Sequence, residues 1–123
     1  MQRFLLDTNA VIYLVNGRLA HPLRDGNYGI SIITEIELLS FPGLSDEEER
    51  KIRELLSALE CVHLTDKVRD HAIKLRRDHR LKIPDAIIAA SALELGATLL
   101  TNDQAFAPVA GLAVEALQLI QEK

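Results

Sequence analysis

The chain has 123 residues, 48% of them hydrophobic, with a formal net charge of −4, which suits a single domain over residues 1–123 with a sizeable core. With three Phe, two Tyr and no Trp, it has few of the rings on which binders of single-stranded nucleic acid stack bases. Its single cysteine, Cys61, excludes an internal disulfide, and no apolar stretch approaches the ~18 residues of a membrane span, so we expect a cytoplasmic protein.

Apolar runs of strand length alternate with helical patterns along the whole chain. Gly17 and Gly96 follow two of the helical patterns, as the left-handed residue that ends many helices does. Ser45 and Glu48 have the spacing of a capping box, which marks a helix start. In chain order the sequence predicts a strand at 3–6, a helix at 9–15, a strand at 28–32, helices at 33–40 and 45–59, a strand at 61–64, helices at 66–79 and 84–95, and strands at 97–101 and 112–116.

Strands separated by helices with short connections imply right-handed crossovers and a mostly parallel sheet. We therefore expect an α/β fold, a three-layer α/β/α sandwich around a central sheet of four or five strands. The helix at 84–95 is apolar nearly all round, so it should be buried. Because ligands of such open sheets bind beyond the carboxyl ends of the strands, residues that follow strands are the candidates for a functional site.

Four acids border apolar runs in this pattern. Asp7 follows the first strand and Asp103 follows the strand at 97–101, so topology places both at one rim. Asp85 lies in the first turn of the buried helix, where the helix dipole favours an anion. Glu37 lies about one turn into its own helix, and it reaches the rim only if that helix packs there. Grouped carboxylates raise one another's pKa and suit hard cations such as Mg²⁺, which predicts a divalent-metal site.

Other interpretations of these acids are open at this point. Asp7 and Asp85 can be helix caps only, with Glu37 and Asp103 as surface charges. A receiver-type phosphoacceptor domain, a signalling switch, also has acids at strand ends, but it places an acidic pair after the first strand, where this chain has Asp7 alone. A dehalogenase-like phosphatase would have an Asp at the position of Asn9.

The pattern resembles the PIN-domain nucleases, and within them the small toxin ribonucleases of the VapC type from toxin–antitoxin pairs. The order and spacing of the matching segments fit over essentially the entire chain. The resemblance implies a PIN-like fold and a metal-dependent endoribonuclease that hydrolyses RNA with metal-activated water and inhibits translation. The matching segments are Leu5-Leu6-Asp7-Thr8-Asn9, residues 30–38, residues 84–92 and residues 99–106.

Carried over by position, the resemblance gives roles to six residues. Asn9 and Thr101 look like the polar residues that orient the acids by hydrogen bonding. The catalytic residues, which would also hold Mg²⁺ or Mn²⁺, are Asp7, Glu37, Asp85 and Asp103.

Thr8 and Glu35 lie close in sequence to two of these acids. Thr8 is expected to be a local turn or cap residue. Glu35 lies about 200° around a helix from Glu37, so both acids cannot easily face one metal. The register of Thr34 with Glu37 favours Glu37.

The resemblance also implies partners: an RNA substrate, a cognate antitoxin and a second copy in a homodimer, with no membrane. The antitoxin's C-terminal segment would occupy a groove formed by the helices at 33–40 and 45–59. A PIN nuclease of RNA processing is an alternative to the toxin. A PIN fold acting only as a binding scaffold is another, although the intact set of four acids argues against lost catalysis.

A basic segment precedes Asp85. Seven of the fourteen Lys and Arg residues lie between Asp66 and Lys82, against three Asp, which gives a local charge of +4. Such a segment can hold RNA phosphates by counterion release, or it can be a solvated helix face. The residues expected to bind RNA are Arg76, Arg77, Arg80 and Lys82.

Overall fold

The structure, a computed structural model, describes residues 1–121, so residues 122–123 of the predicted domain lie outside the described part. The strands form one sheet in the order β3-β2-β1-β4-β5, and each of its strand pairings is parallel. The predicted α/β fold with a parallel sheet is therefore confirmed. In chain order the elements are β1 (Arg3–Leu6), α1 (Thr8–Val15), β2 (Asn27–Ser31), α2 (Ile32–Leu39), α3 (Asp46–Ser57), β3 (Glu60–Val62), α4 (Asp66–His79), α5 (Ile83–Leu95), β4 (Thr98–Leu100), a 3-10 helix (Gln104–Phe106) and β5 (Val114–Glu115).

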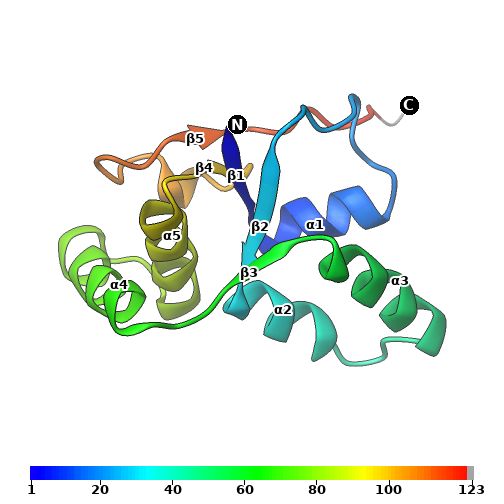
Figure 1. Ribbon diagram of the computed structural model, residues 1–123, viewed down its shortest axis with the longest axis horizontal. Coiled ribbons are helices and arrows are strands. Elements are labelled where there is room, and N and C mark those ends of the chain that lie inside the picture. Colours follow the sequence, from blue (N-terminus) through cyan, green and yellow to red (C-terminus); the bar gives the residue numbers. More distant parts are fainter. Residues whose placement is uncertain (122–123) are drawn as a thin grey trace.

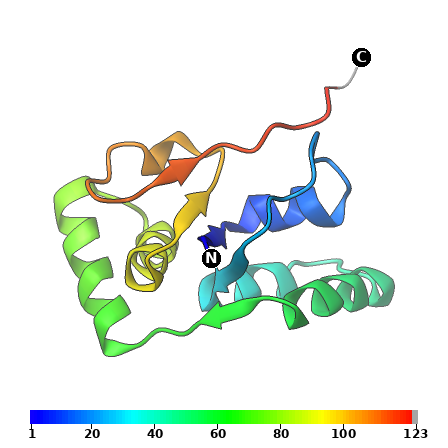
Figure 2. The same cartoon turned by 45° about the horizontal axis from the view of Figure 1, so that its top comes forward.

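The central strand β1 separates two hydrophobic cores. Phe4 and Leu6 belong to the core that α1, α2 and α3 cover, whereas Leu5 belongs to the core that α4 and α5 cover. Figures 1 and 2 show these two groups of helices on opposite sides of the sheet. Alternate residues of a strand face opposite sides, so one short strand supplies both cores. The predicted three-layer sandwich is confirmed.

Capping side chains and left-handed residues mark several of the helix ends. Ser45 and Glu48 form the predicted capping box, with each side chain accepting from the other residue's backbone N–H at 3.1 Å. Gly96 ends α5 with a left-handed φ of 65°. Arg80 ends α4 in the same conformation, with φ 55°, although for a residue with a side chain this conformation costs about 1–2 kcal/mol. None of the helices in residues 1–121 is long and apolar enough to cross a membrane.

The segment after β5 runs beside the loop between α1 and β2. Leu19 and Leu119 form an isolated antiparallel bridge. Asn102, two residues after β4, holds the backbone of Leu117 with both ends of its amide: Nδ2 donates to the Leu117 carbonyl at 3.1 Å, and Oδ1 accepts from the Leu117 N–H at 2.7 Å. The end of β4 is thereby tied to residues late in the chain.

Candidate metal centre

The carboxyl ends of β1 and β4 lie side by side in the middle of the sheet. Leu6 and Leu100, the last residues of these strands, are partners in the register. Asp7 N donates to the Leu100 carbonyl at 3.2 Å and so continues the pairing. Asp7 and Thr101 therefore emerge at the same edge, where a functional site of a parallel sheet is expected.

Asp7 is a buried acid and the N-cap of α1. Its Oδ1 accepts from Ala10 N at 2.8 Å, and its Oδ2 accepts from Thr101 Oγ1. Both bonds favour the ionised form, yet the pKa of Asp7 is raised, first by burial and then by the charges of Asp103 and Glu37. Burial and like charge therefore outweigh the two hydrogen bonds. Asp7 is a cap, but it is also one of a group of acids.

Thr101 joins Asp7 to Asp103. Its buried hydroxyl donates to Asp7 Oδ2 and accepts from the Asp103 N–H at 3.0 Å. Asp103 is exposed, and its Oδ1 caps the 3-10 helix by accepting from Ala105 N at 2.9 Å. One side chain thus sets the positions of two acids that follow neighbouring strands.

Asp85 lies in the first turn of α5 without capping it. The N-cap residue is Lys82, and no side chain makes the cap hydrogen bond, so the interpretation of Asp85 as a cap is wrong. The pKa of Asp85 is raised by burial and by the charges of Asp103, Glu37 and Asp7, while Lys82 opposes the rise. Asp7 and Asp85 therefore each lie within electrostatic reach of the other three predicted acids.

Glu37 and Glu35 point to different parts of the molecule. The charge of Glu37, an exposed residue of α2, acts on both Asp7 and Asp85. The charge of Glu35 acts instead on Cys61 of β3, whose pKa is raised by burial and by Glu35. Glu37 belongs to the group of acids, which we call the acidic cluster: Asp7, Glu37, Asp85 and Asp103.

Thr8 makes contacts that the sequence analysis missed. Its Oγ1 donates to Glu37 Oε1 at 2.6 Å and lies 3.1 Å from Thr34 Oγ1. The expected local role for Thr8 is wrong, because Asp7 caps α1 and Thr8 bonds across to α2. Local spacing carries no signal of such a tertiary contact. Asn9 is exposed and its side chain has no hydrogen bond within residues 1–121, so its orienting role stays a prediction.

The donor chemistry of the acidic cluster fits a hard divalent cation, which takes oxygen ligands. Over residues 1–121, no Lys or Arg forms an ion pair with any of its members. In that same range no group of three or more His, Cys, Asp and Glu side chains is placed so that it could hold a metal ion as it stands. Asp103 is exposed, so its side chain can rotate toward Asp7. A cation would relieve the repulsion that, after burial, raises the pKa of Asp7 and Asp85.

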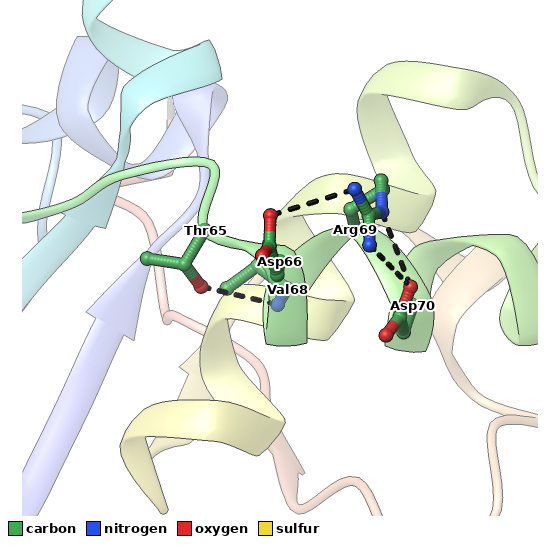
Figure 3. Close-up of polar contacts among 5 residues, drawn as sticks. All are labelled: Thr65, Asp66, Val68, Arg69 and Asp70. Atoms are coloured by element: carbon green, nitrogen blue, oxygen red, sulfur yellow. Dashed lines mark hydrogen bonds and ion pairs between the residues drawn. The ribbon is translucent and has the colours of Figure 1, made fainter.

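The start of the basic segment is neutralised locally. Thr65 Oγ1 accepts from Val68 N at 3.2 Å and caps α4. Figure 3 shows Arg69 between Asp66 and Asp70, with ion-pair distances of 3.4 and 3.1 Å. These charges compensate one another, so this end of α4 offers little net attraction to a phosphate.

The other end of the basic segment adjoins the acidic cluster. Arg77, Arg80 and Lys82 are exposed and form no ion pair within the described residues. Arg76 differs, because its Nη1 donates to the Leu81 carbonyl at 3.0 Å. Lys82 is close enough for its charge to oppose the rise in the pKa of Asp85. The uncompensated positive charge therefore reaches the edge where the acids lie.

An apolar groove of about 590 Å³ also adjoins the acidic cluster. It lies between α1, α2 and α3, and Thr8 and Glu37 are among its lining residues. Phe41, 67% exposed, is its most accessible large apolar side chain. The remaining apolar lining consists of Ile12, Val15, Leu38, Pro42, Leu44 and Ile52.

Known proteins share this sequence pattern and fold. The PIN domain family matches residues 4–112. A toxin–antitoxin complex from Klebsiella pneumoniae contains a chain 30% identical, with a TM-score of 0.77 over 89% of this chain and 94% of that one. VapBC2 from Rickettsia felis bound to a promoter DNA fragment and DNA-bound VapBC from Salmonella typhimurium are each 25% identical, with TM-scores of 0.78 and 0.77, over 95% and 94% of this chain and 100% and 98% of those chains. Among curated proteins no match was found.

The chain therefore belongs to the PIN-domain family. The predicted resemblance to this family and to its VapC-type members is confirmed, and with it the expectation of a nuclease. The receiver-domain alternative is excluded, because receiver sheets have the strand order 2-1-3-4-5, whereas this sheet has the order β3-β2-β1-β4-β5.

Proposed function

We propose that this protein is a divalent-metal-dependent endoribonuclease that serves as the toxin of a toxin–antitoxin pair. The observation that supports this most is the acidic cluster at the carboxyl edge of a PIN-family sheet. The pKa of Asp7 and that of Asp85 are raised first by burial and then by the charges of other members. Acids with raised pKa values that lie close together are typical of functional sites. A bound cation would offset the repulsion between them.

The acids and the neighbouring basic residues have different parts in the proposed reaction. Mg²⁺ or Mn²⁺ bound here would polarise the phosphodiester and make water a better nucleophile. Asp7 is the most firmly held of the acids, because two hydrogen bonds and burial fix its carboxylate. Glu37 and Asp103 are exposed and complete the donor set from the solvent side. Arg77, Arg80 and Lys82 hold RNA phosphates beside the acids.

The apolar groove is the proposed binding site for the cognate antitoxin. An antitoxin segment with apolar side chains would bury Phe41 and the lining residues around it. The groove is lined in part by Glu37, a member of the acidic cluster, and by Thr8, which bonds to Glu37. A segment bound there would therefore block RNA from the acids. We also propose that the protein forms the predicted homodimer. Light scattering, which measures the mass of the protein in solution, tests this.

Cleavage of total RNA with and without metal tests the nuclease. The purified protein should cut RNA with Mg²⁺ or Mn²⁺ and should not cut it in EDTA. Asp85→Asn is the matched inactive variant, because Asp85 makes no cap hydrogen bond and its loss should leave α5 intact. Parent-like cleavage by Asp85→Asn, or cleavage in EDTA, would contradict the proposal.

The toxin role is tested with the reading frame just upstream. A small DNA-binding protein encoded there should form a complex with this chain and suppress its cleavage of RNA. Phe41→Asp should weaken the complex, whereas Ile73→Asp, at an apolar residue of α4 that is 51% exposed and outside the groove, should not. A nuclease that cuts RNA but binds no such partner would instead support the alternative of RNA processing.

A further inference from the structure

We propose that Thr34 and Thr8 form a directed hydrogen-bond chain that positions Glu37 for cation binding. The inference rests on the proposed function, because it takes Glu37 as a cation ligand. Thr8 and Thr34 touch neither substrate nor reacting atoms, so both act as positioning residues. The chain runs from the interior of the protein to the acidic cluster through two hydroxyl groups.

The direction of the chain follows from the number of protons. An ionised carboxylate only accepts hydrogen bonds, and a hydroxyl group has one proton to donate. Thr8 Oγ1 lies 2.6 Å from Glu37 Oε1, so Thr8 donates its proton there. The 3.1 Å contact between the two threonine hydroxyls then has one possible direction, with Thr34 donating to Thr8. Bonds aligned in this way polarise and strengthen one another.

The buried end of the chain is firmly anchored. Thr34 lies in the first turn of α2 and its side chain is fully buried, at 0% exposure. Thr8 is the first residue of α1 and directly follows Asp7, the N-cap. The helix start that holds Asp7 therefore also holds Glu37, so two acids from different parts of the chain share one support.

Glu37 needs such a support. It is an exposed side chain with three rotatable bonds, and an unrestrained Glu loses rotamer entropy when it is fixed. The bond from Thr8 removes part of that freedom before a cation arrives. Groups that orient metal ligands in this way typically change metal affinity by about 10–100-fold when they are removed.

A second explanation is that the two threonines only join α1 to α2. Removing the hydroxyl of Thr8 would then lower stability without a specific effect on cation binding. The two explanations separate in a variant that lacks both hydroxyls. Thr8→Val alone leaves the buried Thr34 hydroxyl without its partner, which is destabilising, whereas Thr8→Val with Thr34→Val replaces both groups by apolar ones of the same shape.

The test is calorimetric titration of the metal-free full chain with Mn²⁺, together with thermal unfolding in EDTA. Thr8→Val should bind Mn²⁺ about 10–100-fold more weakly than the parent. Thr8→Ser keeps the hydroxyl and should recover most of the affinity. The double variant should regain the melting temperature lost in Thr8→Val while its Mn²⁺ affinity stays low. In RNA cleavage at a fixed, limiting Mn²⁺ concentration, kcat should fall in Thr8→Val with little change in KM.

The outcomes distinguish the two proposals. If the parent binds Mn²⁺ and Thr8→Val binds it equally well, the positioning role is wrong and the threonines only join the helices. The same conclusion follows if the double variant regains both stability and affinity. If the parent binds no Mn²⁺, the proposed metal-dependent function fails, and the positioning role fails with it.

Discussion

Thr101 donates a hydrogen bond to the carboxylate of Asp7, which lies 94 residues earlier in the chain. The two residues directly follow β4 and β1, which are neighbours in the sheet, and the same hydroxyl accepts from the Asp103 N–H. Two acids that the sequence separates widely are therefore set by one buried side chain.

Thr101→Val should impair both the fold and the acidic cluster. The substitution keeps the side-chain shape but leaves Asp7 Oδ2 without its donor and the Asp103 N–H without its acceptor, which costs about 1–3 kcal/mol of unfolding free energy. RNA cleavage should fall by about 10–100-fold, as for other groups that orient metal ligands. Urea unfolding and single-turnover cleavage measure the two effects. Thr101→Ser should retain both properties; a Thr101→Val that cleaves like the parent would make Thr101 purely structural.

Asp7→Asn should not destabilise the metal-free protein at neutral pH. Because the pKa of folded Asp7 is raised above its ordinary value of 3.8, its contribution to stability is complete below that value and is lost as pH rises through the raised pKa. The variant lacks the buried charge, so its melting temperature relative to the parent should rise between about pH 4 and pH 7. Thermal unfolding in EDTA across this range measures the difference.

Added Mg²⁺ or Mn²⁺ should reverse the order of stability. The parent should gain stability because the ion binds only the folded state, and Asp7→Asn should gain less. Cleavage by the variant should be nearly abolished. A metal-free Asp7→Asn that melts well below the parent at neutral pH would show that Asp7 matters chiefly as the cap of α1.

Cleavage should leave a 5′-phosphate and a 3′-hydroxyl. In the proposed mechanism water attacks phosphorus and the 3′ oxygen leaves, so the 2′-hydroxyl of RNA would take no part. Ligation of adaptors to the product ends, with and without prior phosphatase or kinase treatment, identifies the termini. Products ending in a 2′,3′-cyclic phosphate would require a different mechanism.

The double substitution Arg77→Ala with Arg80→Gly should weaken RNA binding and flatten its salt dependence. Each lost phosphate contact should reduce the slope of log K against log salt by about 0.7 for single strands. Turnover on saturating RNA should change much less. Glycine suits the left-handed conformation of Arg80, so stability should not fall through strain at this position.

Arg69→Ala is the matched control for the basic segment, since Arg69 already pairs with Asp66 and Asp70. This control should leave the salt slope unchanged. Arg76 is left in place in both variants, because its guanidinium is bonded to the Leu81 carbonyl and its removal would disturb the end of α4. If the salt slope of the double variant is unchanged, Arg77 and Arg80 do not bind phosphate and belong to a solvated helix face.

Local patterns in the sequence were enough to predict most of the fold. The first strand is the clearest case, because its apolar run ends abruptly at Asp7, and the predicted bounds of β1 match the structure. The capping box at Ser45 and the glycine at position 96 were equally local signals. The strand predicted at 61–64 lies at Glu60–Val62, and the strand predicted at 112–116 is reduced to Val114–Glu115, because the sheet pairing covers only part of each apolar run.

Three features of the structure were not predicted. Arg80 has a left-handed backbone conformation. Glycine is the usual residue in this conformation, so the sequence did not indicate it. The 3-10 helix at Gln104 depends on the cap that Asp103 provides. The bond between Thr8 and Glu37 forms because α1 packs on α2, and neither residue's neighbours indicate it. The acids were predicted from their places at strand and helix ends, and Thr101 was predicted from the family resemblance as a residue that orients them, whereas the support from Thr8 was not predicted.

The acidic cluster can be completed only late in the synthesis of the chain. Asp7 is among the first residues synthesised, yet its strand lies at the centre of the sheet and its partner Thr101 follows 94 residues later. Asn102, beside that partner, bonds to Leu117, which is made later still. Contacts this distant in sequence form only after the intervening chain is available. A nascent chain that has not yet extended through β4 therefore carries Asp7, Glu37 and Asp85 without Thr101 and Asp103, so the acidic cluster can assemble only when most of the chain has been synthesised.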